Sequence, residues 1–384
     1  MKRSLSVICL LCSLLPLLCP VCAAALEPAG SAALPIAAPS AILMEKETGT
    51  ILYEKDADRR QPPASVTKVM TLLLLIEDIE AGKMALDDIV TASARAASFG
   101  GSCVYLEQGE QMSVHEMLKC IAVVSANDCA VAMAEHVSGT EEVFVERMNR
   151  RAAELGLENT HFMNCTGLFE DAGHYSTARD IAVMSRELIR HPLIKDYSGI
   201  WMDSIRGGAF ELANTNKLVY WYPGCTGLKT GYTSQAMYCL SATAERDGVE
   251  YIAVVMHGES SDSRNTDATV LLNYAFANYA LCPLRPEKAL EPLPVEMGRE
   301  AALPLVYGGE AYALVPRGGG EPEYRLELPG RVTAPVREGE RIGTLTVRQG
   351  GGTVAEVPVL AARDAKRVGF GGIVKRLAGS LVGF

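Results

Sequence analysis

A proline-rich stretch from Pro283 to Pro294 divides this chain of 384 residues into two parts with different sequence patterns. Before it, helical apolar patterns lie between strand-like runs; after it, short alternating runs are separated by glycine-rich turns. Proline has no backbone N–H to donate and interrupts regular elements, so such a stretch is typical of a linker. The pattern predicts a mixed helix and strand domain over 26–284 and a small β-rich domain over 285–362.

Several elements of the first part follow from periodicity. Residues 40–54 indicate two strands around a turn at Gly49, and residues 238–256 indicate a second antiparallel hairpin. Helical patterns cover 65–80, 114–137 and 262–279. The middle one carries a polar trio on an otherwise apolar helix, and buried polar groups need a reason to be there; the trio is Ser125, Asn127 and Asp128.

The composition excludes two broad classes of protein. A hydrophobic fraction of 48% with 21% charged residues is typical of a folded globular chain, which excludes disorder of the whole. The formal net charge is −10, whereas a protein that follows a phosphate backbone carries the opposite sign. We therefore expect no nucleic-acid partner.

The first 25 residues have the pattern of a secretory signal peptide. Lys2 and Arg3 precede an uncharged, leucine-rich run through Cys22, and three alanines of the size that a signal peptidase accepts follow it. The alternative is an uncleaved membrane anchor, but two prolines interrupt the run and it is short for a span of about 20 residues. The pattern predicts a signal peptide over 1–25 and export of the rest.

Cysteine and histidine placement gives no metal or cofactor site. Four of the eleven cysteines lie within 1–25, and the remaining seven are scattered without a C-x-x-C pair, so most are expected to be small buried apolar residues. The six histidines form no zinc-binding pattern, and no Walker loop or dinucleotide fingerprint occurs. We therefore predict no metal and no cofactor. The seven cysteines are Cys103, Cys120, Cys129, Cys165, Cys225, Cys239 and Cys282.

The last segment, 363–384, changes character again. It holds five basic residues against Asp364 alone, and its apolar residues fall on one helical face. This pattern predicts an amphipathic helix that lies in a membrane interface. Five glycines make such a helix unfavourable in water, so we expect it to order on lipid. The alternative is a helix that packs on its own protein.

Ser65 and Lys68 place a hydroxyl and an amine three residues apart at the start of a predicted helix, where both project from one face. A serine hydroxyl needs a base within hydrogen-bond reach, and a lysine can be that base when burial lowers its pKa. The free N–H groups of the helix start can stabilise an oxyanion. Alone, the pair also fits an N-capping serine followed by a solvated lysine.

Two further motifs favour the catalytic interpretation. Ser125 and Asn127 put a hydroxyl and an amide two residues apart, where they need a polar cleft. Lys229, Thr230 and Gly231 come before the predicted strand at Tyr238, and the glycine would let a substrate backbone approach closely. Three weak patterns in this order make a strong one.

With these motifs the sequence resembles the serine penicillin-recognising enzymes, whose motifs are S-x-x-K, S-x-N and K-T-G. Within that group it resembles the D-alanyl-D-alanine carboxypeptidases, the low-molecular-mass penicillin-binding proteins. Similar stretches also occur at 63–71, 155–162, 174–180, 214–218 and 227–233, and the C-terminal parts are similar too. The resemblance implies an α/β (α+β) fold: a β-lactamase/transpeptidase-like catalytic domain with an antiparallel sheet flanked by helices, a small C-terminal all-β domain and an amphipathic tail helix.

The resemblance also implies acyl transfer. Ser65 would attack the carbonyl of the penultimate D-alanine, and Lys68 would take its proton. Ser125 and Lys229 would pass a proton to the departing amine, and Asn127 would hold the peptide and the lysine in register. The backbone N–H groups of Ser65 and Tyr232 would form the oxyanion hole. The substrate-binding residues would be Lys229, Thr230, Gly231, Tyr232 and Arg264, the last either as a helper for the terminal carboxylate or as a surface ion pair.

Other activities share these residues. A β-lactamase needs a further carboxylate, for which Glu154 is a candidate, but its spacing to Asn159 is one residue too long. A D-alanyl endopeptidase and a catalytically silent protein that senses penicillin or binds the cell wall also remain open. Cys165 and Thr226 depart from the residues common in the family, which affects the expected loop shape and substrate fit.

The expected partners follow from the same resemblance. They are a peptidoglycan stem peptide as substrate, β-lactam antibiotics as inhibitors, and a membrane surface that contacts the tail. With a signal peptide, the protein would be extracytoplasmic and peripheral on the outer face of the cytoplasmic membrane.

Overall fold

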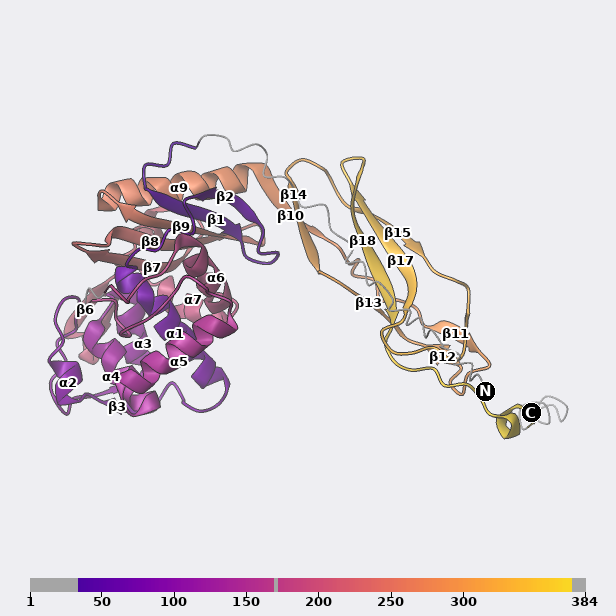
Figure 1. Cartoon of the computed structure of the whole chain (residues 1–384), viewed down its shortest axis with the longest axis horizontal. Coiled ribbons are helices and arrows are strands. Elements are labelled where there is room, and N and C mark those ends of the chain that lie inside the picture. Colours follow the sequence, from indigo (N-terminus) through magenta and orange to yellow (C-terminus); the bar gives the residue numbers. More distant parts are fainter. Residues whose placement is uncertain (1–33, 169–171, 375–384) are drawn as a thin grey trace, which may run out of the picture.

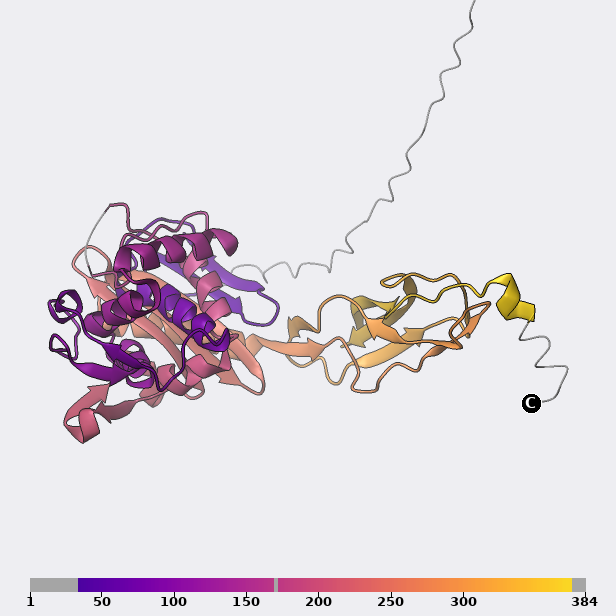
Figure 2. The ribbon, with the colours of Figure 1, turned by 90° about the horizontal axis from the view of Figure 1, so that it is seen from below.

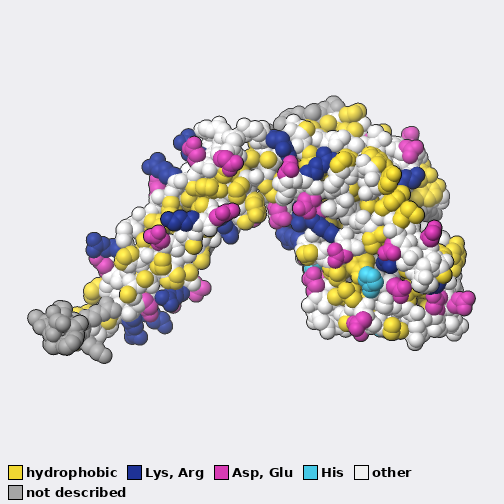
Figure 3. Space-filling view, turned by 180° about the vertical axis from the view of Figure 1, so that it is seen from behind, with side chains coloured by type: hydrophobic (Ala, Val, Ile, Leu, Met, Phe, Trp, Pro, Cys, Tyr) yellow, Lys and Arg dark blue, Asp and Glu magenta, His cyan; other side chains and the backbone are white. Residues whose placement is uncertain are grey.

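The computed structural model describes residues 34–168 and 172–374, which form two bodies (Figure 1). The larger body contains the helices α1 to α9 around a sheet, and the narrower body is built from the strands β10 to β18. The space-filling view shows that the two bodies meet at one end and then diverge (Figure 3). The prediction of a signal peptide over 1–25 lies outside the described residues.

A five-stranded antiparallel sheet forms the centre of the larger body, in the order β2-β1-β9-β8-β7. It contains the two hairpins predicted at 40–54 and 238–256. The first runs through β1 (Ser40–Glu45) and β2 (Ile51–Lys55), and the second through β8 (Met237–Arg246) and β9 (Val249–Gly258). The edge strand β7 (Cys225–Thr233) carries Lys229, Thr230 and Gly231, where periodicity alone had placed no strand.

The inner strands are apolar on both faces because helices cover both (Figure 1). Leu43 and Val255 pack in the cluster with α9 (Ser261–Asn278), whereas Ile42 and Val254 pack with the larger cluster around α1 (Lys68–Glu80). The helix predicted from 65 therefore exists, with a 3₁₀ turn over Ala64–Thr67 in front of it. The fold class predicted from the resemblance is confirmed.

Helix α1 lies at the centre of the helical layer and is buried nearly all round, as its apolar sequence requires. The helices around it are α3 (Val114–Val123), α4 (Asn127–Ser138), α5 (Glu141–Glu154) and α6 (Ala178–Leu188). Side chains that accept a backbone N–H begin three of these helices and α9, which is the capping that their sequences favour; the caps are Ser113, Thr140, Thr177 and Ser260.

The helical region predicted over 114–137 is not one continuous helix but two, α3 and α4. The chain breaks between α3 and α4, and Ser125 lies in the break with φ +65°. The break is held by backbone hydrogen bonds, from the N–H of Ala126 to Cys120 O (3.1 Å) and from the N–H of Asn127 to Ser102 O (2.7 Å). Ser125 and Asn127 therefore do not share a helix face: Ser125 precedes α4, and Asn127 begins it.

Short elements complete the larger body. They are α2 (Ala94–Ala97), α7 (Lys195–Ser198) and α8 (Leu218–Trp221), the pair β3 (Ile89–Thr91) with β4 (Gln111–Ser113), and the pair β5 (Met202–Ile205) with β6 (Phe210–Ala213).

The second body has its own apolar core and is elongated (Figure 2). Its first strand, β10 (Tyr279–Pro283), directly follows α9 and pairs with β14 (Tyr312–Pro316). The other strands form a three-stranded and a four-stranded sheet. They are β11 (Leu293–Glu296), β12 (Ala302–Leu303) and β16 (Val332–Thr333), then β13 (Leu305–Tyr307), β18 (Gly352–Ala361), β17 (Arg341–Gln349) and β15 (Glu323–Glu327).

Five of the seven cysteines outside 1–25 are buried, and all seven are free thiols, as expected of small core residues.

Within the described part of the predicted tail, residues 370–374 are helical, and Phe370 is 83% exposed. The remainder of that predicted helix lies outside the described residues. No helix in the described ranges has the length and apolar character needed to cross a membrane.

Candidate active site

Ser65 lies in the 3₁₀ turn that leads into α1, beside the edge strand β7. Gly231 explains how the strand comes so close: a Cβ there would lie 2.8 Å from Pro63 O and 3.1 Å from the backbone N of Ser65. The sequence had suggested that Gly231 makes room for a substrate backbone. The structure adds a second reason for glycine, because the space of a Cβ is filled by the chain's own turn at Ser65, and the approach of a substrate stays a prediction.

Lys68 occupies the first residue of α1 and is completely buried. Its Nζ lies 3.2 Å from Ser65 Oγ, 2.6 Å from Asn127 Oδ1 and 2.8 Å from the carbonyl oxygen of Thr166. Burial lowers the pKa of Lys68 to about 7, although nearby Cys165, Cys103 and Asp128 act in the opposite direction. The alternative of a solvated lysine is therefore wrong, and the amine sits where it can exchange a proton with the serine.

Lys229 brings a second buried amine from β7, and its side chain is 1% exposed. Burial lowers its pKa well below the usual value, and the positive charges of Lys68 and Arg264 lower it further. Its Nζ donates a hydrogen bond to the carbonyl oxygen of Thr230 (2.9 Å). The two amines are close enough to influence one another, so a proton on one disfavours a proton on the other.

Ser125 and Asn127 complete the cluster from the break between α3 and α4. The Asn127 amide accepts from Lys68 through Oδ1 and donates through Nδ2 to Gly100 O (2.9 Å), which fixes its orientation. Ser125 Oγ is buried and has no hydrogen-bond partner among the described residues. A buried hydroxyl without a partner costs free energy, so this one is available to a bound substrate.

Two residues of the cluster were not predicted. Thr166 contributes only its carbonyl oxygen to Lys68, and a backbone atom leaves no signal in residue types. Thr215 accepts a hydrogen bond from Thr230 Oγ1 (2.7 Å), and its N–H binds Val123 O. The stretch 214–218 was among those similar to the known family, so a signal for Thr215 was present.

Arg264 is 4% exposed and is not a surface ion pair. Its guanidinium donates to Cys239 O (3.3 Å) and Ser261 Oγ (3.2 Å), and lies 5.9 Å from the ring centre of Tyr238. Burial lowers its pKa, while its charge contributes to lowering the pKa of Lys229. Arg264 therefore lies against β8, close enough for its charge to act on Lys229. Tyr232, in contrast, is 55% exposed, and its ring lies 4.4 Å from that of Tyr238.

Comparison with known proteins assigns the family. The family model described as D-alanyl-D-alanine carboxypeptidase matches residues 27–260, and the model described as penicillin-binding protein 5, C-terminal domain, matches residues 283–367. This chain belongs to the D-alanyl-D-alanine carboxypeptidase family. It is a serine-type carboxypeptidase of this class, as predicted from the sequence.

Relatives cover nearly the whole chain. The chain is 41% identical over 353 residues to D-alanyl-D-alanine carboxypeptidase DacF of Bacillus subtilis, covering 90% of each protein. It is 31% identical to DacC of Escherichia coli, over 87% of this chain and 85% of that protein. Among solved structures, penicillin binding protein 5 of Haemophilus influenzae matches with a TM-score of 0.75 at 31% identity, over 86% and 98% of the two chains.

A further solved structure is of penicillin-binding protein D2 from Listeria monocytogenes in its ampicillin-bound form. It matches with a TM-score of 0.58 at 30% identity, over 63% of this chain and 99% of that one. Nearly all of that chain matches only 63% of this carboxypeptidase. This is consistent with the division of the present structure into two bodies.

Two competing sites receive no support from the geometry. Glu154, the candidate carboxylate of a β-lactamase, lies at the end of α5, where its Oε2 is 3.4 Å from Arg151 Nη1 and its side chain is 55% exposed. Glu77, Glu187 and His191 bring possible metal ligands within 4.8 Å of one another. However, Arg151 binds both carboxylates, at 2.7 and 2.9 Å, and Arg190 binds Glu187 at 3.2 Å, so two guanidinium groups offset the two carboxylates and we assign no metal there.

Proposed function

We propose that this carboxypeptidase removes the terminal D-alanine from peptidoglycan pentapeptide stems through an acyl-enzyme on Ser65, and that β-lactams acylate the same residue. The observation that carries the proposal is the 3.2 Å contact between Ser65 Oγ and a fully buried amine whose pKa is about 7. An amine of that pKa is about half in its neutral, proton-accepting form at pH 7, whereas a solvated lysine is almost entirely protonated.

Acylation begins when Ser65 attacks the carbonyl of the penultimate D-alanine and its proton passes to neutral Lys68. The backbone N–H groups of Ser65 and Tyr232 stabilise the oxyanion, and one such donor is typically worth about 3 kcal/mol. Ser125 and Lys229 then pass a proton to the nitrogen of the leaving D-alanine. The free Oγ of Ser125 supports this role, because it has room for a new hydrogen bond. Water hydrolyses the acyl-enzyme and restores Ser65.

Thr230 and Arg264 bind the terminal carboxylate of the peptide. Thr230 lies on β7 one residue from Lys229, and the positive charge of Arg264 acts on the same site. A buried guanidinium favours an anion beside it, because a carboxylate there offsets its charge. The peptide therefore enters with its carboxyl end toward Thr230.

A purified sample incubated with a pentapeptide stem is expected to release D-alanine, and a tagged penicillin is expected to leave its mass on the tryptic peptide that contains Ser65. A silent sensor or wall-binding protein would be tagged without releasing D-alanine. A β-lactamase would hydrolyse the penicillin rapidly and leave little adduct. Cleavage of D-alanyl cross-links in the same assay would add endopeptidase activity. A tag on any other residue would refute the Ser65 mechanism.

We also propose that the chain is exported, loses residues 1–25 and is peripheral on the outer face of the cytoplasmic membrane, held there by the tail over 363–384. The charged start and leucine-rich run support export, and exposed Phe370 in the tail supports contact with lipid. The protein made in a secreting host should have the intact mass of a chain that begins at residue 26. A mature protein that keeps Met1, or that is found in the cytoplasm, would contradict export.

A further inference from the structure

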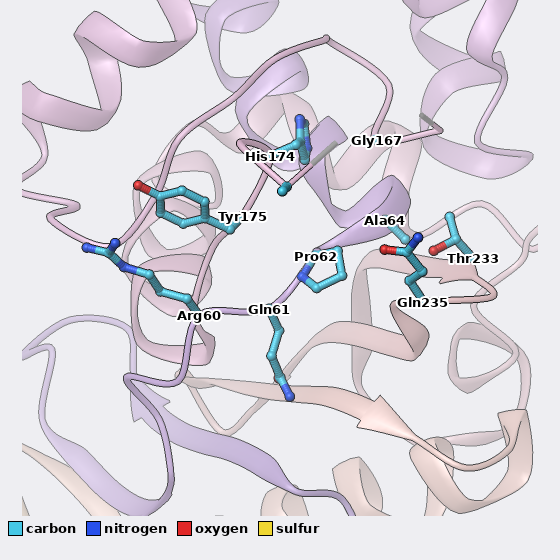
Figure 4. Close-up of a pocket in the computed structure, with 10 residues that line it drawn as sticks. Arg60, Gln61, Pro62, Ala64, Gly167, His174, Tyr175, Thr233 and Gln235 are labelled. Carbon is cyan, nitrogen blue, oxygen red and sulfur yellow. The ribbon is translucent and has the colours of Figure 1, made fainter. Parts of the chain in front are cut away.

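A groove of about 320 Å³ opens directly beside the nucleophile turn (Figure 4). Ala64, the residue before Ser65, lies in its wall together with Gly167. Thr233, the last residue of β7, and Gln235, from the turn after it, line one end, while Arg60 and Tyr175 line the other (Figure 4). The groove therefore leads from the catalytic serine to an arginine.

The side chain of Arg60 is held in place but is not neutralised. Its guanidinium carbon lies 4.8 Å from the ring centre of Tyr175, and its Nε donates to Asn159 Oδ1 (3.1 Å). Across the ranges that the structure describes, no hydrogen bond or ion pair engages its Nη1 or Nη2. None of the described residues that line the groove is acidic. The arginine thus presents a free, oriented pair of donors, the arrangement that suits a carboxylate.

The direction of β7 places a substrate in this groove. In the proposed function, on which this inference depends, the terminal carboxylate lies at Thr230 and the reacting carbonyl lies between the N–H groups of Ser65 and Tyr232. A peptide that continues along the strand in the same direction passes Thr233 and leaves toward Gln235. The residues on the acyl side of the cleaved bond then enter the groove.

We propose that the groove binds the acyl-side part of the peptide substrate and that Arg60 binds a carboxylate carried by it. The site selects stems with a free acid in this part over stems in which that acid is an amide. Arg60 is open to water on one side, so the selectivity is modest and falls at high salt.

A matched pair of substrates tests this selectivity. The probes are acetylated tripeptides that end in D-alanyl-D-alanine and begin with either 2-aminoadipic acid or its side-chain amide, and the measurement is kcat/KM for D-alanine release. The wild type should prefer the acid by roughly five-fold, the size expected of a partly exposed ion pair. In Arg60→Gln the ratio should fall to about one.

Arg59→Gln is the matched control, because Arg59 is an exposed neighbour that lines a different hollow. It should keep the wild-type ratio. A merely structural Arg60 would change both rates together and leave the ratio intact, which would overturn the proposal, as would equal rates for the two peptides in the wild type. If neither peptide released D-alanine while a penicillin still tagged Ser65, the carboxypeptidase function itself would fail instead.

Discussion

Lys68→Met is expected to slow the acylation of Ser65 by a penicillin about a thousandfold, the range of a lost general base. Methionine has nearly the length of lysine but cannot accept the proton of Ser65 Oγ. It also leaves Asn127 Oδ1 and Thr166 O without their donor, so the variant should lose about 1 to 3 kcal/mol of unfolding free energy. The second-order rate constant for tagged penicillin, measured against Ser65→Ala as background, gives the effect on chemistry.

Lys119→Met is the matched control for buried lysine. Lys119 is 7% exposed on α3, and its Nζ binds Ser204 O at 2.9 Å and Asp203 at 3.0 Å, away from the nucleophile. This variant should lose stability but keep the acylation rate. Equal rate losses in the two variants would mean that Lys68 acts only through stability.

The pH dependence separates the two roles of Lys68 further. Burial lowers its pKa to about 7, so the wild-type rate should level off above pH 7 and fall about tenfold per unit well below it, as Lys68 becomes protonated. In Lys68→Met this dependence should disappear, since the titrating base is gone. A wild-type profile that is flat from pH 5 to pH 8 would contradict Lys68 as the base.

The elements predicted correctly from the sequence are those that local patterns determine. The hairpins at 40–54 and 238–256, the helix after Ser65 and α9 follow from the alternation of apolar residues, which is a property of each segment alone. The order of the three motifs was sufficient to indicate the family. The contact between β7 and the turn at Ser65 depends on how the whole domain packs, which no single segment encodes.

The features of the site that could not be predicted from the sequence are formed by backbone atoms. The break at Ser125 is fixed by the carbonyl groups of Cys120 and Ser102, and the third acceptor of Lys68 is the carbonyl of Thr166. Every residue has such a carbonyl, so residue types do not distinguish these from others. The sequence singled out Gly231 but not the contact that requires a glycine there. That contact is with Pro63, 168 positions earlier, which only the fold brings close.

Gly167→Ala is expected to damage both the fold and the site. Gly167 has φ +73°, a conformation that costs a residue with a side chain about 1 to 2 kcal/mol. In addition, its Cβ would overlap the carbonyl group of Ala64 and lie 2.6 Å from Thr67 Oγ1, on either side of Ser65. The turn must move to relieve the overlap, so we expect a total loss of roughly 3 kcal/mol or more of unfolding free energy.

The same overlap should displace Ser65 relative to Lys68, and a shift of about 1 Å can cost roughly a hundredfold in rate. Gly156→Ala isolates the backbone term, because Gly156 has φ +72° but nothing within 4 Å of its Cβ position. It should lose only about 1 to 2 kcal/mol and keep the penicillin acylation rate of the wild type. Unfolding midpoints and acylation rates of the two variants decide the matter. If Gly167→Ala matched Gly156→Ala in both, the loop at Gly167 would not hold the nucleophile turn in position.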